Sequence, residues 1–240
     1  MEFKEAYETI VARSVQKNTI EIPTILSCLD FEGAECLEIG AGPQARIAIK
    51  LAGFAKHITC LEKDADNVSK IGGEAGYHDV EKKISALYYK YEKEKFPFPD
   101  KKFDVVYCAW LPHKTVTDTR FLDEMMRVSR KHILILMPGI KGDEPKLVSI
   151  VKKGEKERRM QYRGQITRFL IAKGFKVDEN YRERLLGMAF TSSKEIRETY
   201  YCLAFKNSLS DKDRKKVDRF LDRRIRSYQR GFYMIHGIRI

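Results

Sequence analysis

The amino-acid sequence predicts an α/β fold in which helices cover both faces of a mostly parallel sheet. Five apolar runs alternate with helical patterns, and they are expected to form strands near residues 35–39, 58–62, 83–88, 103–108 and 132–137. This alternation is typical of a doubly wound parallel sheet. A glycine turn follows the first run, and an acidic residue ends the second. Together these features predict a nucleotide pocket at the carboxyl ends of the strands.

Two helices are expected before the first strand. Phe3, Tyr7, Ile10 and Val11 have the spacing of an amphipathic helix, and residues 20–29 form a second helical pattern. Neither belongs to the nucleotide-binding sheet itself. We expect residues 1–30 to form an N-terminal helical cap.

The run Cys36-Leu37-Glu38-Ile39-Gly40-Ala41-Gly42-Pro43 is the most informative stretch of the chain. It predicts a buried strand that ends in an acid and breaks into a glycine turn before a helix from Gln44 to Ala52. Glycines let the backbone approach a ligand closely, and amide groups at the start of the helix face the crevice. Two classes of cofactor bind at such a turn.

The first class is a dinucleotide such as NAD. Residues 40–45 fit the pattern G-x-G-x-x-A, and Glu62 lies 20 residues beyond Gly42. The second class is S-adenosylmethionine, which carries an ammonium and a sulfonium. Glu38 favours this cofactor, because two unit charges a few ångströms apart in a partly buried site interact by roughly 4 kcal/mol, and a carboxylate repels a diphosphate.

The next strand, Ile58-Thr59-Cys60-Leu61-Glu62, also ends in an acid. Its carboxylate can accept both hydroxyls of a ribose. Both cofactor classes contain a ribose, so Glu62 supports the nucleotide fold without choosing between them.

Later segments resemble the class I S-adenosylmethionine-dependent methyltransferases. The run from Phe96 to Cys108 is similar to the family's segment entering strand four, and the runs Glu124–Arg130 and His132–Gly139 resemble its fourth helix and fifth strand. The resemblance covers about residues 30–140. It implies a Rossmann-like, seven-stranded, mostly parallel sheet with an antiparallel C-terminal strand, an enzyme, and S-adenosylmethionine as cofactor, with S-adenosylhomocysteine as product.

The resemblance also assigns cofactor-binding residues. It implies that Glu38, Gly40, Ala41 and Gly42 surround the methionyl part, that Glu62 with its neighbour Lys63 holds the ribose side, and that backbone at Cys108 and Ala109 closes the pocket. The chain departs from the family in two places. Gln44 replaces the third glycine, and Tyr91-Glu92 stands where the family often has Gly-Asp against adenine, so that Glu92 becomes the candidate acceptor.

Beyond residue 140 the pattern changes. Helices are expected at about 161–173, 193–205 and 211–228, with strands near Phe175 and from Gly231 to Ile240. The helical insertion at about 190–228 resembles the acceptor-side segment of small-molecule methyltransferases of the quinone-biosynthesis type. We therefore expect one domain over residues 1–240, with a cofactor-binding half at 31–140 and an acceptor-side half at 141–240.

Composition limits the possible partners. The chain of 240 residues has a net charge of +12, and two segments carry most of it: residues 152–168, with seven basic and two acidic residues, and residues 211–230, with nine and four. A solvated helix face is the favoured explanation, because no series of stacking aromatic residues alternates with these arginines, as binding of a single strand would favour. An RNA or protein methyltransferase using these segments stays open as an alternative, as does a non-catalytic cofactor-binding module or an NAD-binding protein.

Other sequence features exclude further classes. No apolar run approaches the roughly 18 to 20 residues that span a bilayer, and the first residues lack a secretory signal, so a cytoplasmic protein without a membrane partner is expected. The five cysteines have no short paired spacing, which predicts neither a metal site nor disulfides.

Methyl transfer from a sulfonium is an in-line displacement, which a protein assists mainly by holding the acceptor close and excluding water. His113 is the candidate catalytic base for an acceptor that must lose a proton. Trp110, the only tryptophan, is a candidate wall of the substrate pocket together with His113. In relatives the leading helices often cover the cofactor, which makes Tyr7 a further candidate. Cys108 lacks the sequence context of a covalent nucleophile.

Overall fold

The computed structural model describes residues 1–15, 17–92, 94–178 and 183–240. Contacts divide the chain into two compact units. The first unit contains residues 1–21, 138–161 and 183–233, and the second contains residues 22–137, 162–182 and 234–240. Grouping by contact is a different property from independent folding, so the single domain expected from the sequence stays a prediction.

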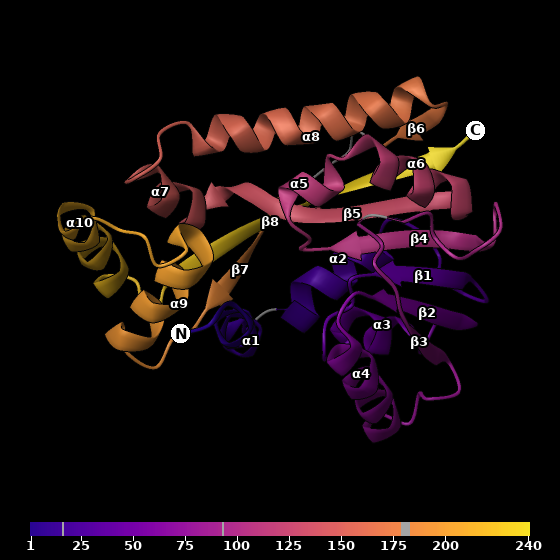
Figure 1. Ribbon diagram of the computed structural model, residues 1–240, viewed down its shortest axis with the longest axis horizontal. Coiled ribbons are helices and arrows are strands. Elements are labelled where there is room, and N and C mark those ends of the chain that lie inside the picture. The colour runs from indigo at the N-terminus through magenta and orange to yellow at the C-terminus, as the bar shows by residue number, and fades with distance from the viewer. Residues whose placement is uncertain (16, 93, 179–182) are drawn as a thin grey trace. The chain divides into compact units, whose positions relative to one another are not determined.

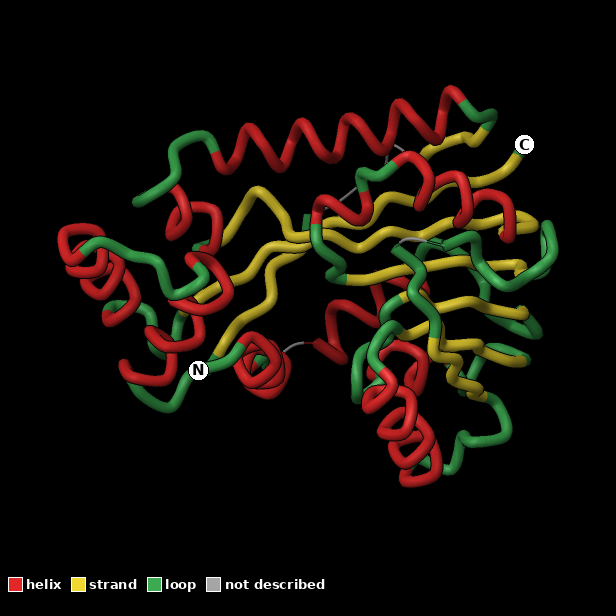
Figure 2. The backbone as a smooth tube through the Cα atoms, in the orientation of Figure 1, coloured by secondary structure: helices red, strands yellow, loops and turns green. Residues whose placement is uncertain are grey.

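The second unit is built on a twisted sheet whose strands lie side by side in Figures 1 and 2. The hydrogen-bonded order is β3-β2-β1-β4-β5-β8-β6. Strands β1 to β5 pair in parallel, and β6 pairs antiparallel with β8. The bounds are β1 Glu35–Ile39, β2 His57–Glu62, β3 Ile84–Tyr88, β4 Phe103–Ala109, β5 Ser129–Gly142, β6 Phe175–Val177 and β8 Tyr228–Arg239.

Helices surround this sheet. They are α2 Ile22–Leu26, α3 Arg46–Leu51, α4 Ala65–Tyr77, α5 His113–Val116, α6 Thr119–Val128 and the C-terminal part of α8 Glu155–Ala172. Apolar residues of β1 are fully buried between the neighbouring strands and helices. The mixed α/β fold predicted from the sequence is confirmed.

The first unit contains the remaining elements. They are α1 Phe3–Arg13, a π-helical turn Lys17–Glu21, α7 Glu144–Ser149, β7 Arg184–Met188, α9 Ser193–Phe205 and α10 Asp211–Asp222. Strand β7 pairs antiparallel with the first residues of β8. Its core gathers apolar and aromatic side chains that include Phe190, Tyr200, Leu221 and Tyr228.

Side-chain caps explain where two of these helices begin. The hydroxyl of Ser192 accepts the backbone N–H of Glu195, and that of Ser210 accepts the N–H of Asp213, as the sequence pattern predicts. Helix α10 ends at Asp222, earlier than the expected residue 228, because Tyr228 already belongs to β8. Strand β7 was not predicted, so the described residues form an eight-stranded sheet instead of seven strands.

None of the helices that the structure describes is both long and apolar enough to cross a membrane.

Candidate functional site

Four strand ends meet in the second unit. Ile39, the last residue of β1, lies opposite Leu61 of β2 and Cys108 of β4, and Glu62 lies opposite Tyr88 of β3. In a parallel sheet the segments after these strands therefore emerge at one edge. This edge collects the glycine turn, Lys63, Tyr91-Glu92 and the segment Trp110–Thr115, which is where the sequence placed the cofactor.

The glycine turn combines one tight position with one open position. Gly40 has a φ of +72°, and a Cβ atom there would lie 2.5 Å from Leu111 Cδ2 and 3.0 Å from the hydroxyl oxygen of Tyr91. Gly42 has a φ of +69°, but its Cβ would meet no heavy atom within 4 Å. Glycine is favoured at both positions by backbone conformation. Only Gly42 also borders empty space, which leaves room for a ligand against the backbone.

The expected helix start shifts by two residues. Ala45 adopts a left-handed conformation with a φ of +38°, so α3 begins at Arg46 and not at Gln44. Gln44 is exposed in the turn. The missing third glycine is therefore accommodated by a longer turn before the helix.

Glu62 joins the second strand end to the glycine turn. Its side chain is 4 % exposed, and Oε2 accepts the Gly42 N–H at 2.8 Å. Oε1 accepts the N–H groups of Lys63 at 2.8 Å and Asp64 at 3.3 Å. The structure thus brings together two residues that are 20 apart in sequence, both predicted to bind cofactor. A carboxylate has about four acceptor positions, so Glu62 can still accept a ligand hydroxyl.

Glu38 is held inside the fold. The residue is 2 % exposed, and its Oε2 accepts the N–H of Ala48 at 3.0 Å and the hydroxyl of Tyr107 at 3.2 Å. Ala48 is the third residue of α3, and the cap residue Ala45 offers this helix no side-chain cap. Glu38, on the preceding strand β1, therefore accepts an unpaired N–H at the positive N-terminus of α3 and stabilises this end of the helix. Its contact with a cofactor stays a prediction.

The carboxylate of Glu38 also influences three buried thiols. Burial raises the pKa of Cys36 to about 12, with added effects of Asp104, Glu35 and Glu38. Burial, followed by the charge of Glu38, raises the pKa of Cys60 and of Cys108 well above the usual range. A thiol that stays protonated is a poor nucleophile. Cys108 is therefore a structural residue of β4 and not a nucleophile. It lies opposite Ile39, the last residue of β1, and Ala109 is the next and last residue of β4.

Glu92 binds two neighbouring strand ends. Its Oε1 accepts the Nζ of Lys63 at 2.8 Å and the Oγ1 of Thr115 at 3.0 Å. Partial burial works to raise the pKa of Glu92, but the hydrogen bonds from Lys63 and Thr115 dominate and lower it. Glu92 is thus an ionised acceptor at the expected position. A role for Thr115 was not predicted, because a single threonine in a short segment carries no recognisable signal.

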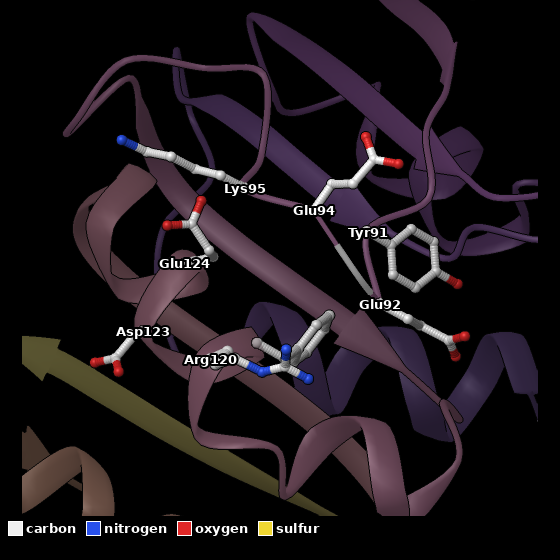
Figure 3. Close-up of a pocket in the computed structure, with 8 residues that line it drawn as sticks. Tyr91, Glu92, Glu94, Lys95, Arg120, Asp123 and Glu124 are labelled. Atoms are coloured by element: carbon white, nitrogen blue, oxygen red, sulfur yellow. The ribbon is translucent and has the colours of Figure 1, made fainter.

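A pocket of about 310 Å³ adjoins this edge of the sheet (Figure 3). It lies between the loop after β3 and helix α6. Its lining residues are Tyr91, Glu92, Glu94, Lys95, Arg120, Phe121, Asp123 and Glu124. Burial, followed by the charges of Glu62 and Glu92, raises the pKa of Tyr91, so its hydroxyl stays protonated beside the glycine turn. Tyr91 and Glu92 therefore lie at the boundary of both the pocket and the crevice.

Two predicted acceptor-side residues follow β4. Trp110 is half-buried with a φ of +62°, and its backbone N–H donates to the backbone carbonyl of Leu136 at 3.0 Å. His113 is the first residue of α5, and its ring stacks on Tyr162 with centroids 4.7 Å apart. Tyr7 lies on α1 in the first unit. The structure therefore places Trp110 and His113 in one short segment, whereas the role of Tyr7 at the pocket stays a prediction.

The basic segments are partly internal. Arg159 is 3 % exposed and binds Glu155 at 2.7 Å, Glu144 at 2.9 Å and the carbonyl of Gly139 at 2.7 Å. Arg230 binds the same Glu144 at 2.7 Å. Guanidinium groups that are committed to protein carboxylates are poorly available to phosphates. These arginines therefore do not form the exposed cationic surface that an RNA acceptor requires.

The described residues contain no group of three or more His, Cys, Asp and Glu side chains that could hold a metal ion.

Comparison with known proteins identifies a domain in the part of the chain that contains these strand ends. Residues 37–136 match a family model described as "Methyltransferase domain". No curated protein sequence matches the chain. The matched segment runs from the second residue of β1 into β5, and it contains every strand end described above.

Solved structures share the fold. A SAM-dependent methyltransferase from Aquifex aeolicus superposes with a TM-score of 0.57 at 12% identity, covering 100% of both chains. A putative methyltransferase from Bacillus halodurans C-125 gives 0.59 at 18% identity, covering 91% of this chain and 98% of its own. Geranyl diphosphate C-methyltransferase from Streptomyces coelicolor A3(2), in complex with Mg2+, geranyl diphosphate and S-adenosyl-L-homocysteine, gives 0.58 at 9% identity, covering 96% and 82%.

At these identities the solved structures show the fold, while the family model identifies the domain. Fold, domain match and the predicted motifs agree on the same strand ends. Residues 37–136 therefore carry a methyltransferase domain, and the chain shares the fold of solved S-adenosylmethionine-dependent methyltransferases.

Proposed function

We propose that this enzyme transfers a methyl group to a small or medium-sized acceptor by in-line displacement. The observation that carries the proposal is the meeting of four strand ends around the open position at Gly42, where no heavy atom lies within 4 Å of a Cβ position. Backbone amides, two carboxylates and the segment after β4 all border this region of the second unit. The arrangement supports binding of an extended nucleotide that has a charged amino-acid end.

Residues around the glycine turn and the neighbouring strand ends fit the cofactor. Gly40, Ala41 and Gly42 would surround the methionyl part, and Glu62 would accept the ribose hydroxyls while it keeps its bond to the Gly42 N–H at 2.8 Å. Lys63 and Glu92 would border the adenine side, with backbone at Cys108 and Ala109 closing the pocket. Bound S-adenosylmethionine supplies a methyl group on a positively charged sulfur.

Glu38 would act through its charge. Its Oε2 already holds Ala48 and Tyr107, so the carboxylate fixes the helix that follows the glycine turn. At a few ångströms in a partly buried site, a unit charge still contributes roughly 4 kcal/mol to the binding of an opposite charge. This favours a cationic amino-acid end over a diphosphate, and it needs no direct hydrogen bond to the cofactor.

The acceptor side would begin after β4. Trp110 would form an aromatic wall, and His113 would take a proton from an acceptor that has to lose one. Tyr7, on α1 of the first unit, stays a candidate residue. Helices α9 and α10 occupy the segment 190–228 that resembles the acceptor-side insertion of small-molecule methyltransferases of the quinone-biosynthesis type.

A small acceptor is favoured by two observations. The arginines 159 and 230, which belong to the basic segments, bind Glu144 inside the first unit. In addition, the Streptomyces coelicolor structure that shares this fold holds geranyl diphosphate, a small molecule.

The first test is isothermal titration calorimetry with S-adenosylhomocysteine and with NAD. Micromolar binding of S-adenosylhomocysteine without binding of NAD supports the proposal, and the opposite preference contradicts it. The acceptor is then sought by incubating a metabolite extract with the enzyme and S-adenosylmethionine. Mass spectrometry should find a small molecule that gains the mass of one methylene group, whereas methylation of RNA alone would contradict a small acceptor.

A further inference from the structure

A chain of three side chains ties the strand ends together. Lys63 follows β2, Glu92 follows β3 and Thr115 belongs to α5 after β4, and both partners donate to the same oxygen, Oε1, of Glu92. We call this set the Lys63–Glu92–Thr115 bridge. Thr115 is buried, whereas the side chains of Lys63 and Glu92 are 44 % and 31 % exposed. The buried end of the bridge is therefore the hydroxyl of Thr115.

Each member of the bridge lies close in sequence to a residue that contacts the glycine turn. Glu62, beside Lys63, accepts the Gly42 N–H. Tyr91, beside Glu92, places its hydroxyl oxygen 3.0 Å from the Cβ position of Gly40. Leu111, four residues before Thr115, lies at the same position of Gly40. A shift of any one strand end therefore moves groups that touch the turn.

Helix α5 depends on outside contacts for its position. It contains only four residues, and its cap residue Pro112 forms no side-chain cap. One helical turn is not stable by its own hydrogen bonds, because the conformational entropy lost in forming the first turn exceeds the stabilisation from its single hydrogen bond. The bond of Thr115 to Glu92 and the stacking of His113 on Tyr162 are contacts that fix it to other elements of the second unit.

From these contacts we propose that Thr115 is a positioning residue, which couples the segment carrying Trp110 and His113 to the cofactor crevice through Glu92. The inference rests on the proposed function. In the part of the chain that the structure describes, Glu92 Oε2 accepts no hydrogen bond, so Glu92 can receive a donor from the ligand and keep the bridge. Cofactor binding would then order the acceptor side, and the acceptor side would in turn strengthen cofactor binding.

The only tryptophan makes this coupling measurable. Trp110 lies five residues before Thr115, so tryptophan emission reports on this segment alone. Three variants are compared with the wild type: Thr115→Val removes the hydroxyl at nearly constant shape, Thr115→Ser keeps it, and Thr117→Val is the matched control. The hydroxyl of Thr117 donates to the carbonyl of His113 at 2.8 Å, within the same helix, and does not contact Glu92.

Calorimetry with S-adenosylhomocysteine gives the affinity, and the titration of Trp110 emission with the same ligand gives the response of the segment. In Thr115→Val the affinity should fall about tenfold, the effect expected from losing one hydrogen bond to a charged group. The emission response seen in the wild type should be lost. Thr115→Ser should restore both quantities, and Thr117→Val should change neither. Thermal unfolding of each variant checks that it is folded.

Two results would overturn the coupling. One is a Thr115→Val variant that binds as tightly as the wild type with the same emission response. The other is wild-type emission that does not respond to bound ligand. Failure of the wild-type protein to bind S-adenosylhomocysteine would instead contradict the proposed function, so the two failures are distinguishable.

Discussion

Two carboxylates, the half-buried Glu144 in the first unit and the buried Glu38 in the second, are held in different ways. In the first unit Glu144 lies between Arg159 at 2.9 Å and Arg230 at 2.7 Å. In the second unit Glu38 accepts hydrogen bonds from a backbone amide and a phenol at its Oε2. Glu144 is therefore neutralised by full positive charges, whereas the described bonds of Glu38 come from dipoles.

The pKa values of neighbouring groups show the consequence. Burial works to raise the pKa of Glu144, but Arg230 and Arg159 outweigh it and lower the pKa to about 2. Glu38 instead contributes to raising the pKa of Cys60, Cys108 and Tyr107, after the effect of burial. Glu144 likewise contributes to raising the pKa of Tyr200 and Tyr228, after the effect of burial, so both charges act on their surroundings. What distinguishes Glu144 is its pair of guanidinium partners, which tie α7 to α8 and β8.

The largest effect is expected from breaking the cluster that Glu144 forms with Arg159 and Arg230. Glu144→Ala leaves Arg159 and Arg230 without their shared partner, and removing one member of a buried ion pair costs about 3–5 kcal/mol. Urea unfolding should show this loss of unfolding free energy. The control Glu198→Ala removes an exposed partner of Lys194, 3.9 Å away, and should change stability little. A loss as small as that of the control would mean that the cluster does not support the first unit.

Substitutions of Glu38 separate its charge from its hydrogen bonds. Glu38→Ala leaves the Ala48 N–H and the Tyr107 hydroxyl without this acceptor and should cost roughly 1–3 kcal/mol of stability. Glu38→Gln keeps an oxygen acceptor, so it should lose less stability but bind S-adenosylmethionine at least about tenfold more weakly. S-adenosylhomocysteine, which lacks the sulfonium, should be affected less. Unchanged affinity of both ligands in calorimetry would argue against a role for the charge.

The two glycines of the turn should respond differently to alanine. Gly40→Ala brings a Cβ against Leu111 and Tyr91 at a positive φ, and should cost roughly 1–3 kcal/mol of unfolding free energy through overpacking. Gly42→Ala meets no neighbour, so only the backbone conformation opposes it, at roughly 1 kcal/mol. If the cofactor lies against Gly42, its affinity should nevertheless fall clearly in Gly42→Ala. Unchanged affinity, measured by calorimetry, would place the ligand elsewhere.

Acid should affect the two units in separate pH ranges. Burial, then the charges of His236 and Lys131, lowers the pKa of His132 from 6.5 to about 4, while Asp104 opposes this. A lowered histidine pKa means that the folded state binds its proton less readily than the unfolded state, so stability falls as the pH drops from about 6.5 to 4. Glu144, with its pKa lowered from 4.5 to about 2, loses its contribution as the pH drops from about 4.5 to 2.

Urea unfolding at a series of pH values checks this order. The decline between pH 6.5 and 4 should be smaller in His132→Phe, and the decline below pH 4.5 should be smaller in Glu144→Gln. Equal pH dependence of wild type and His132→Phe would contradict the assignment of the upper range to His132.

Local sequence patterns predicted much of this molecule. The strand at Glu35–Ile39, the cap Ser192 of α9 and the cap Ser210 of α10 follow from short-range rules of burial and hydrogen bonding. The sequence missed β7, because Arg184–Met188 becomes a strand only by pairing with β8, some 45 residues later in the chain. It also extended α10 beyond Asp222, since the same residues could continue a helical pattern.

By itself the sequence determined the α/β class, the glycine turn and the two acidic residues near the strand ends, because each depends on residues close together in the chain, and it indicated the cofactor through a resemblance to a known family. Tertiary structure alone decided that Glu38 holds the start of α3, that Thr115 and Lys63 share one oxygen of Glu92, and that Arg159 and Arg230 turn inward to Glu144. The residue type fixes the charge and the hydrogen-bonding capacity of each side chain. Which partner satisfies them depends on how distant segments pack, and a buried polar group takes whichever donor or acceptor the fold brings within reach.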